Sequence, residues 1–145
     1  KITLIDDSYN ASPASMAAAF ASMTATPPTI MILSEMRELG DATATEHAAL
    51  MSKINGLSPR LVIALGSAMH DALDGLDDAI AAIAAPDTAA AVQNLEDAVE
   101  DGDIIFVKGS LGSGSWRVRD AILANFDAES STGASSQNGG NSHAA

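Results

Sequence analysis

Five short apolar runs alternate with amphipathic helical patterns, and this alternation limits the folds open to the chain more than any other feature. The runs span residues 2–5, 30–33, 61–65, 79–84 and 104–107. The fourth run fits either an alanine-rich strand or a helix, and we interpret it as a strand. Repeated alternation favours a parallel sheet, because parallel neighbours need a crossover connection. We therefore expect an α/β, Rossmann-like, three-layer domain with a mainly parallel sheet of about five strands and helices on both faces.

The chain length and the composition of its last residues suggest one folded domain followed by a tail. A length of 145 residues suits a single domain. Residues 128–145 are rich in Ser, Gly, Asn, Gln and Ala and lack apolar periodicity, which predicts a disordered tail. We place the domain at residues 1–127. Because the chain opens directly on a predicted strand, we also expect it to be a fragment of a larger protein.

Charge and residue usage exclude several classes of function. The formal net charge of −12 argues against a nucleic-acid surface, which needs clustered Lys and Arg. The absence of cysteine excludes disulfides, thiolate metal sites and a cysteine nucleophile. No apolar run approaches the roughly 20 residues that a membrane span requires. No Gly-x-x-x-x-Gly-Lys-Ser/Thr phosphate-binding loop occurs either, so we expect no ATP hydrolysis by this chain alone.

Polar residues follow three of the predicted strands at the points where those strands end. The segments are residues 6–10, 34–38 and 108–110, with a weaker Gly-Ser pair at 66–67. Parallel strands bring such exit loops to one edge of the sheet, where ligands bind in open α/β folds. A lysine beside a glycine-rich turn can hold an anion. The 108–110 segment is equally typical of a flexible connection.

Ordinary structural roles compete with the functional interpretation. One Asp in a turn usually caps its own backbone, but two adjacent Asp followed by Tyr9 and Asn10 favour a site. His47, His70 and His143 have no partner spacing typical of a metal site, so we expect no bound metal. No nucleophile–histidine–carboxylate arrangement can be identified from sequence spacing.

Four stretches resemble, in the same order, motifs in the C-terminal domain of the Mur ligases, the bacterial enzymes that extend the peptide of peptidoglycan precursors. Residues 4–13 (LIDDSYNASP) are similar to the family's IDDxYNANP, and residues 32–40 (ILSEMRELG) to its LGDMxELG. Residues 46–47 (EH) resemble the histidine position that follows, and residues 107–110 (VKGS) the family's VKGS. The first motif points to the branch of the family that adds D-alanyl-D-alanine.

This resemblance implies a reaction and a set of partners. The family has three domains, and the central one would bind most of the ATP and Mg²⁺, so that this fragment alone holds neither. D-Ala-D-Ala would be joined to UDP-MurNAc-tripeptide through an acyl phosphate in the bacterial cytoplasm. The partners would be these substrates, ATP and the central domain of the same chain, with no nucleic acid and no membrane span.

The resemblance also assigns nucleotide or dipeptide contacts, with no complete catalytic set and no metal ligand in this chain. The assigned residues are Asp7, Tyr9, Asn10, Glu35, Arg37, His47, Lys108, Gly109 and Ser110. The last three would lie on the dipeptide side. The arginine that commonly follows VKGS in the family is replaced by Leu111, so Lys108 or Arg37 would have to supply a carboxylate-binding charge.

We expect Asp7, Asn10, Glu35 and Lys108 to surround one cleft. Lys108 should be ionised and paired with a carboxylate when no ligand is bound. Asp7, interpreted as a polar turn residue, should contribute little to the core. Two other interpretations stay open at this point: another Mur-type or folylpolyglutamate-type ligase, and a non-catalytic nucleotide- or peptide-binding module.

Overall fold

The computed structural model describes residues 1–8, 11–109 and 111–132, and its elements alternate as the sequence predicts. The six strands are β1 (Ile2–Asp7), β2 (Ile30–Ser34), β3 (Leu61–Leu65), β4 (Ala81–Ala85), β5 (Ile104–Lys108) and β6 (Ala128–Thr132). The α-helices are α1 (Pro13–Ser22), α2 (Thr43–Leu57), α3 (Ser67–Ala72), α4 (Thr88–Ala98) and α5 (Ser115–Asn125). Short 3₁₀ turns cover Gly40–Ala42, Leu73–Gly75 and Leu111–Ser113. Among the described residues, no helix has the length and apolar character needed to cross a membrane.

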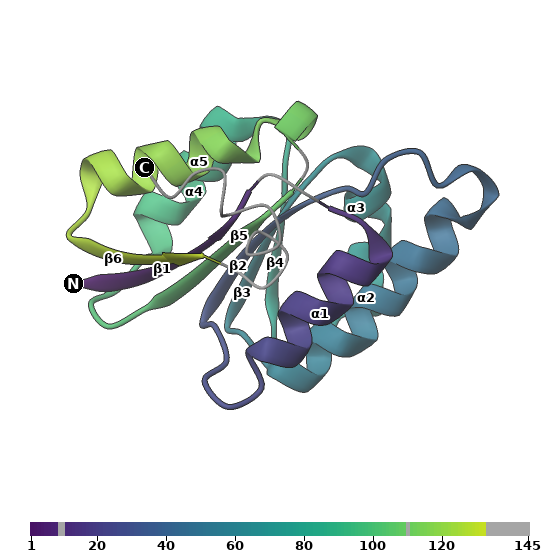
Figure 1. Cartoon of the computed structure of the whole chain (residues 1–145), viewed down its shortest axis with the longest axis horizontal. Coiled ribbons are helices and arrows are strands. Elements are labelled where there is room, and N and C mark those ends of the chain that lie inside the picture. The colour runs from purple at the N-terminus through teal and green to yellow at the C-terminus, as the bar shows by residue number, and fades with distance from the viewer. Residues whose placement is uncertain (9–10, 110, 133–145) are drawn as a thin grey trace.

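One sheet with strand order β4-β3-β2-β5-β1-β6 forms the middle layer, and every neighbouring pair runs parallel. Helices α1, α2 and α3 cover one face, and α4 and α5 cover the other (Figure 1). The expected three-layer, Rossmann-like α/β class and the strand interpretation of the fourth apolar run are therefore confirmed.

Strand β6 corrects the expected boundary of the tail. Ala128–Thr132 pairs with β1 in parallel register, so the prediction of disorder is wrong for these five residues. The strand carries no apolar signal because it lies at the edge of the sheet. The backbone of β6 forms hydrogen bonds with the outer edge of β1, and such bonds depend little on the side chains of β6. The rest of the predicted tail, residues 133–145, lies outside the described residues.

Apolar side chains fill both spaces between the sheet and its helices. Every residue of β2 and β3 is buried, which is typical of parallel strands covered on both faces. Phe20 of α1 meets Phe106 of β5 edge to face in the first core, with ring centroids 6.2 Å apart. Leu95 of α4 and Ile122 of α5 belong to the second core. Burial on both faces holds the strands in register and so fixes where each exit loop begins.

The first helix begins at Pro13, directly after the N-cap residue Ser12. Ser12 accepts a hydrogen bond from the Ser15 backbone N–H, and the Ser15 hydroxyl accepts one from the Ser12 N–H, at 3.1 and 2.9 Å. Pro13 occupies the first turn, where a missing N–H costs nothing. The capping fixes the start of α1 close to the end of β1.

A buried carboxylate anchors the opposite edge, where the strands begin. Asp103 is 5 % exposed and binds the Arg60 guanidinium through both of its oxygens. It also accepts hydrogen bonds from the Thr29 hydroxyl at 2.8 Å and the Glu100 N–H at 2.7 Å. Arg60 donates further to the Ala98 carbonyl at 2.6 Å. The network ties the starts of three strands to the end of α4.

Candidate anion-binding crevice

The exits of β1, β2 and β5 are adjacent in the sheet, as predicted. Strand β5 lies between the other two, with Lys108 in register with Asp7 on one side and Leu33 on the other. The chain leaves β1 and β2 towards the face covered by α1 and α2, but it leaves β5 towards α5 on the opposite face (Figure 1). Neighbouring strands whose connections diverge in this way open a ligand crevice at their carboxyl ends.

Asp7 and Lys108 form an ion pair at the base of this crevice. The Lys108 Nζ lies 2.9 Å from Asp7 Oδ2, and both side chains are 0 % exposed. Burial lowers the pKa of Lys108, and the hydrogen bond and charge of Asp7 oppose that shift. The expected pairing of Lys108 with a carboxylate is therefore confirmed. The expectation that Asp7 contributes little to the core is wrong, because its register position directs the carboxylate inward.

Three serine hydroxyls surround Gly109, the residue after this pair. A Cβ at Gly109 would lie 1.8 Å from Ser34 Oγ, 2.6 Å from Ser115 Oγ and 2.9 Å from Ser113 Oγ. Ser34 and Ser113 share a hydrogen bond of 2.9 Å, and Ser115 donates to the Ser8 carbonyl at 3.2 Å. Glycine is required here by the close approach of its neighbours, and the network links the exits of all three strands.

Glu35 lies beside the start of α3. Its Oε1 accepts the Ala68 N–H at 2.9 Å, and its own N–H donates to the Leu65 carbonyl at 2.9 Å. A carboxylate at the first turn of a helix satisfies an otherwise unpaired N–H. The structure therefore places Glu35 against the β3 exit, whereas Lys108 pairs with Asp7.

His47 is fully buried and supports the loop that follows β2. Its Nε2 accepts the Met36 N–H at 2.9 Å, and its Nδ1 lies 2.7 Å from the Thr43 carbonyl, so Nδ1 carries the proton. Both ring nitrogens are engaged within the protein. We therefore withdraw His47 from the expected ligand contacts and assign it the positioning of Met36.

Arginines supply the charge at this edge, and sequence reasoning missed two of them. Arg119 of α5 lies 3.5 Å from Asp6 Oδ2 and 3.5 Å from Ser8 Oγ, with 15 % of its side chain exposed. Arg117 lies over the Trp116 ring at 4.8 Å from its centroid. Arg117 and Arg119 lie in the first two turns of the helix that follows the glycine-rich β5 exit. Their closeness to that exit in the sequence was the signal that could have identified them. Arg37, which was predicted, is exposed in the β2 exit loop.

Four of the chain's seven basic residues thus gather at or beneath one edge of the sheet: Arg37, Lys108, Arg117 and Arg119. The chain as a whole carries a net charge of −12. Two of the four are paired with carboxylates, Lys108 with Asp7 and Arg119 with Asp6 and Asp120, and the exposed Arg37 and Arg117 are the cations that can meet an anion here. Among the described residues, no group of three or more His, Asp or Glu side chains is arranged to hold a metal ion. The predicted Tyr9, Asn10 and Ser110 lie outside the described residues.

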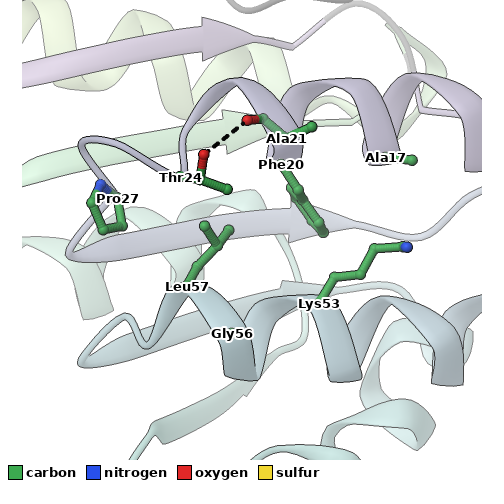
Figure 2. A pocket seen from close by; sticks show the side chains of 8 residues that line it. All are labelled: Ala17, Phe20, Ala21, Thr24, Pro27, Lys53, Gly56 and Leu57. Atoms are coloured by element: carbon green, nitrogen blue, oxygen red, sulfur yellow. Dashed lines mark hydrogen bonds between the residues drawn. The ribbon is translucent and has the colours of Figure 1, made fainter.

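The structure has a pocket far from this crevice and a groove beside it. A pocket of about 330 Å³ between α1 and α2 is lined mainly by apolar side chains, with Lys53 at one end (Figure 2). Its residue Pro27 lies just before β2, so this pocket is near the edge where the strands begin. A groove of about 500 Å³ lies instead between the starts of α2 and α3, lined by Gly40, Asp41, Thr43, Ala44, Ala48, Ala68, Asp71 and Ala72. This groove adjoins the crevice, because Ala68 is bonded to Glu35.

Comparison with known proteins gives one consistent result. Residues 1–111 match the family described as "Mur ligase, glutamate ligase domain". The UDP-N-acetylmuramoyl-tripeptide–D-alanyl-D-alanine ligase of Mycobacterium bovis is 32% identical over 154 aligned positions, covering 86% of this chain and 29% of that protein. The chain therefore spans under a third of this relative's length.

Solved structures show the same fold. MurF from Acinetobacter baumannii aligns with a TM-score of 0.69 and 24% identity, over 84% of this chain and 27% of that one. MurF ligase from Thermotoga maritima in complex with ADP aligns with a TM-score of 0.69 and 21% identity, over 85% of this chain and 28% of that one. The similarity again covers a minor part of each longer protein.

Proposed function

The chain belongs to the Mur ligase family, and we propose that it serves as the C-terminal domain of an ATP-dependent ligase that adds D-Ala-D-Ala to UDP-MurNAc-tripeptide in the bacterial cytoplasm. The match to the ligase domain over residues 1–111 and the similarity to the M. bovis enzyme support this proposal. The domain would contribute the crevice at the ends of β1, β2 and β5.

The observation that carries the proposal is the concentration of basic residues at this edge of an acidic chain. ATP, the tripeptide and the dipeptide all present phosphates or carboxylates. Exposed guanidinium groups at one edge of a protein of opposite overall charge attract such groups to one place. The ammonium of Lys108 is paired with Asp7, and Arg119 is paired with Asp6 and Asp120, so Arg37 and Arg117 are the exposed cations at this edge.

The proposed reaction forms one amide bond at the expense of one phosphoanhydride bond. The terminal carboxylate of the tripeptide takes the γ-phosphoryl group of ATP, which releases ADP. The D-Ala-D-Ala amine then attacks the acyl phosphate, and phosphate leaves as the amide forms. This domain would orient the nucleotide or the dipeptide through Asp7, Tyr9, Asn10 and the 108–110 segment. Asp7 acts on ligands by holding the β1 exit in place.

The nucleotide phosphates and Mg²⁺ would be bound mainly by a central domain outside this chain. The exposed Arg37 and Arg117 of this chain would then contact the nucleotide from the side opposite the central domain. The family resemblance assigns the Mg²⁺ ligands to that central domain. We therefore propose that this chain works together with that central domain, and that both belong to one longer polypeptide.

The full-length protein provides the test. With ATP, Mg²⁺, UDP-MurNAc-tripeptide and D-Ala-D-Ala, it should release phosphate only when all components are present, whereas the 145-residue chain alone should release none. A sequence encoding a phosphate-binding loop and a sugar-binding domain should precede Lys1 in the same reading frame. Turnover with glutamate or another amino acid in place of the dipeptide would indicate another Mur-type or folylpolyglutamate-type ligase. Ligand binding without turnover would indicate a non-catalytic module.

A further inference from the structure

The pocket of about 330 Å³ between α1 and α2 has no part in the proposed function (Figure 2). Its walls are mainly apolar, and two of them, Phe20 and Leu57, are anchored in the core on that face of the sheet. Small-molecule sites typically measure about 300–1,000 Å³ and combine apolar walls with few polar groups. The pocket therefore has the size and lining of a site for a small, largely apolar molecule.

One wall of the pocket is formed by Gly56, and nothing in the described part of the chain requires glycine there. The residue lies within α2, where glycine is less favourable than alanine. Its φ lies outside the left-handed region, and a Cβ at this position would meet no atom of the described residues within 4 Å. The missing side chain therefore leaves open space at the pocket, at a cost to the helix.

Lys53 is the one charged residue among the eight that line the pocket. It is exposed, and no carboxylate within residues 1–8, 11–109 and 111–132 forms an ion pair with it. No Asp or Glu stands three or four residues away on α2, the spacing at which helical side chains pair. In a chain with a net charge of −12, this ammonium is thus left available to an anion from outside.

The ends of the two helices set the direction in which an anionic ligand would lie. Neither α1 nor α2 has a basic residue in its last turn, and the unpaired carbonyls there carry partial negative charge. The Thr24 hydroxyl donates to the Ala21 carbonyl at 3.2 Å and adds no donor to the pocket. Lys53 lies about one turn before the end of α2. A carboxylate therefore belongs at Lys53, with its apolar body towards Leu57 and Pro27.

We propose that the pocket binds a small aliphatic monocarboxylate, with its carboxylate on the Lys53 ammonium and its chain along Phe20 and Leu57. The lining side chains are spread along the two helices from Lys53 to Pro27, which suits an extended chain (Figure 2). One cation matches one negative charge, so the several charges of a nucleotide are not matched here. Because the site lies near the edge where the strands begin, away from the crevice, the inference does not depend on the proposed function.

Octanoate titrated into the full 145-residue chain tests the proposal by two-dimensional NMR of the backbone amides. It should cause saturable shifts at the pocket, in residues 17–27 and 53–57. Octanol has the chain without the charge, and acetate has the charge without the chain, so each should bind more weakly by a factor of about ten or more. Lys53→Gln should weaken octanoate binding about tenfold, the lower end for a charge-assisted hydrogen bond, because Lys53 is exposed.

Gly56→Leu fills the pocket without removing the cation. The fold should be retained, with a melting temperature equal to or above that of the original chain, because leucine favours a helix and meets open space. Octanoate binding should be lost. Lys1→Gln is the matched control, since it removes the same charge from an exposed lysine outside the pocket, and it should leave the affinity unchanged.

The proposal would be overturned by shifts that do not saturate, or by octanol binding as tightly as octanoate. It would also be overturned by retained binding in a folded Gly56→Leu, or by equal affinities in Lys53→Gln and Lys1→Gln. None of these results bears on ligation, which is measured separately by phosphate release.

Discussion

Replacing Lys108 by methionine should cost this domain a large part of its stability. The substitution keeps the length and apolar stem of the side chain and removes the ammonium. It leaves the Asp7 carboxylate, at 0 % exposure, without the partner that lies 2.9 Å away. Because a buried charge loses its solvation on folding, the loss of its counter-charge is felt almost in full.

The expected magnitude follows from that burial. Removing one member of a buried ion pair costs about 3–5 kcal/mol, against a total stability of about 5–15 kcal/mol for a typical domain. Asp7→Leu should cost a similar amount, because it leaves the Lys108 ammonium buried. The double variant should lose less than either single variant, since two apolar side chains need no counter-charge. The coupling free energy between the two positions should therefore be several kcal/mol.

Urea denaturation of the four proteins measures this cycle. Far-UV circular dichroism reports the whole fold, and the fluorescence of Trp116, the chain's single tryptophan, reports the crevice edge. Lys53→Met is the control, since replacement of an exposed lysine should change the free energy of unfolding by about 0.5 kcal/mol or less. Losses below about 1 kcal/mol for Lys108→Met, or additive losses in the double variant, would refute a buried, coupled ion pair.

Four further changes test other parts of the structure. Gly109→Ala should be destabilising, because its Cβ would overlap the Ser34 hydroxyl; an unchanged urea midpoint would contradict the packing described. Burial raises the pKa of Asp103, but hydrogen bonds from Arg60 and two other donors outweigh it and hold the pKa below its ordinary 3.8. The ionised Asp103 therefore stabilises the fold above pH 3.8, and this stabilisation is lost as the pH falls towards the lower pKa of the folded state. Between pH 5 and 3, the urea midpoint of Asp103→Asn should therefore fall less steeply than that of the original protein. His47→Phe should cost about 1–3 kcal/mol, because it leaves a buried N–H without its acceptor; a smaller effect by calorimetry would argue against that role. Ending the chain before Ala128–Thr132 removes the outer partner of β1 and should lower the melting temperature relative to a chain that ends after it.

The sequence by itself determined the architecture. Apolar runs and helical periodicity specify strands and helices locally, and their alternation leaves a parallel sheet as the main solution. Ser12 and Pro13 specify the start of the first helix through interactions within a single turn. The common edge for the exits of β1, β2 and β5 followed from parallel strand direction alone.

The tertiary structure decided where individual side chains point. Lys108 and Asp7 are 101 positions apart, and only their opposition in neighbouring strands turned a predicted ligand contact into a buried ion pair. His47 was expected to contact a ligand, whereas the fold buries it and bonds it to the Met36 N–H. Strand β6 had no apolar signature, because backbone pairing at a sheet edge leaves little trace in side-chain patterns. Local patterns encode the elements, whereas burial and partner choice depend on contacts between residues distant in sequence.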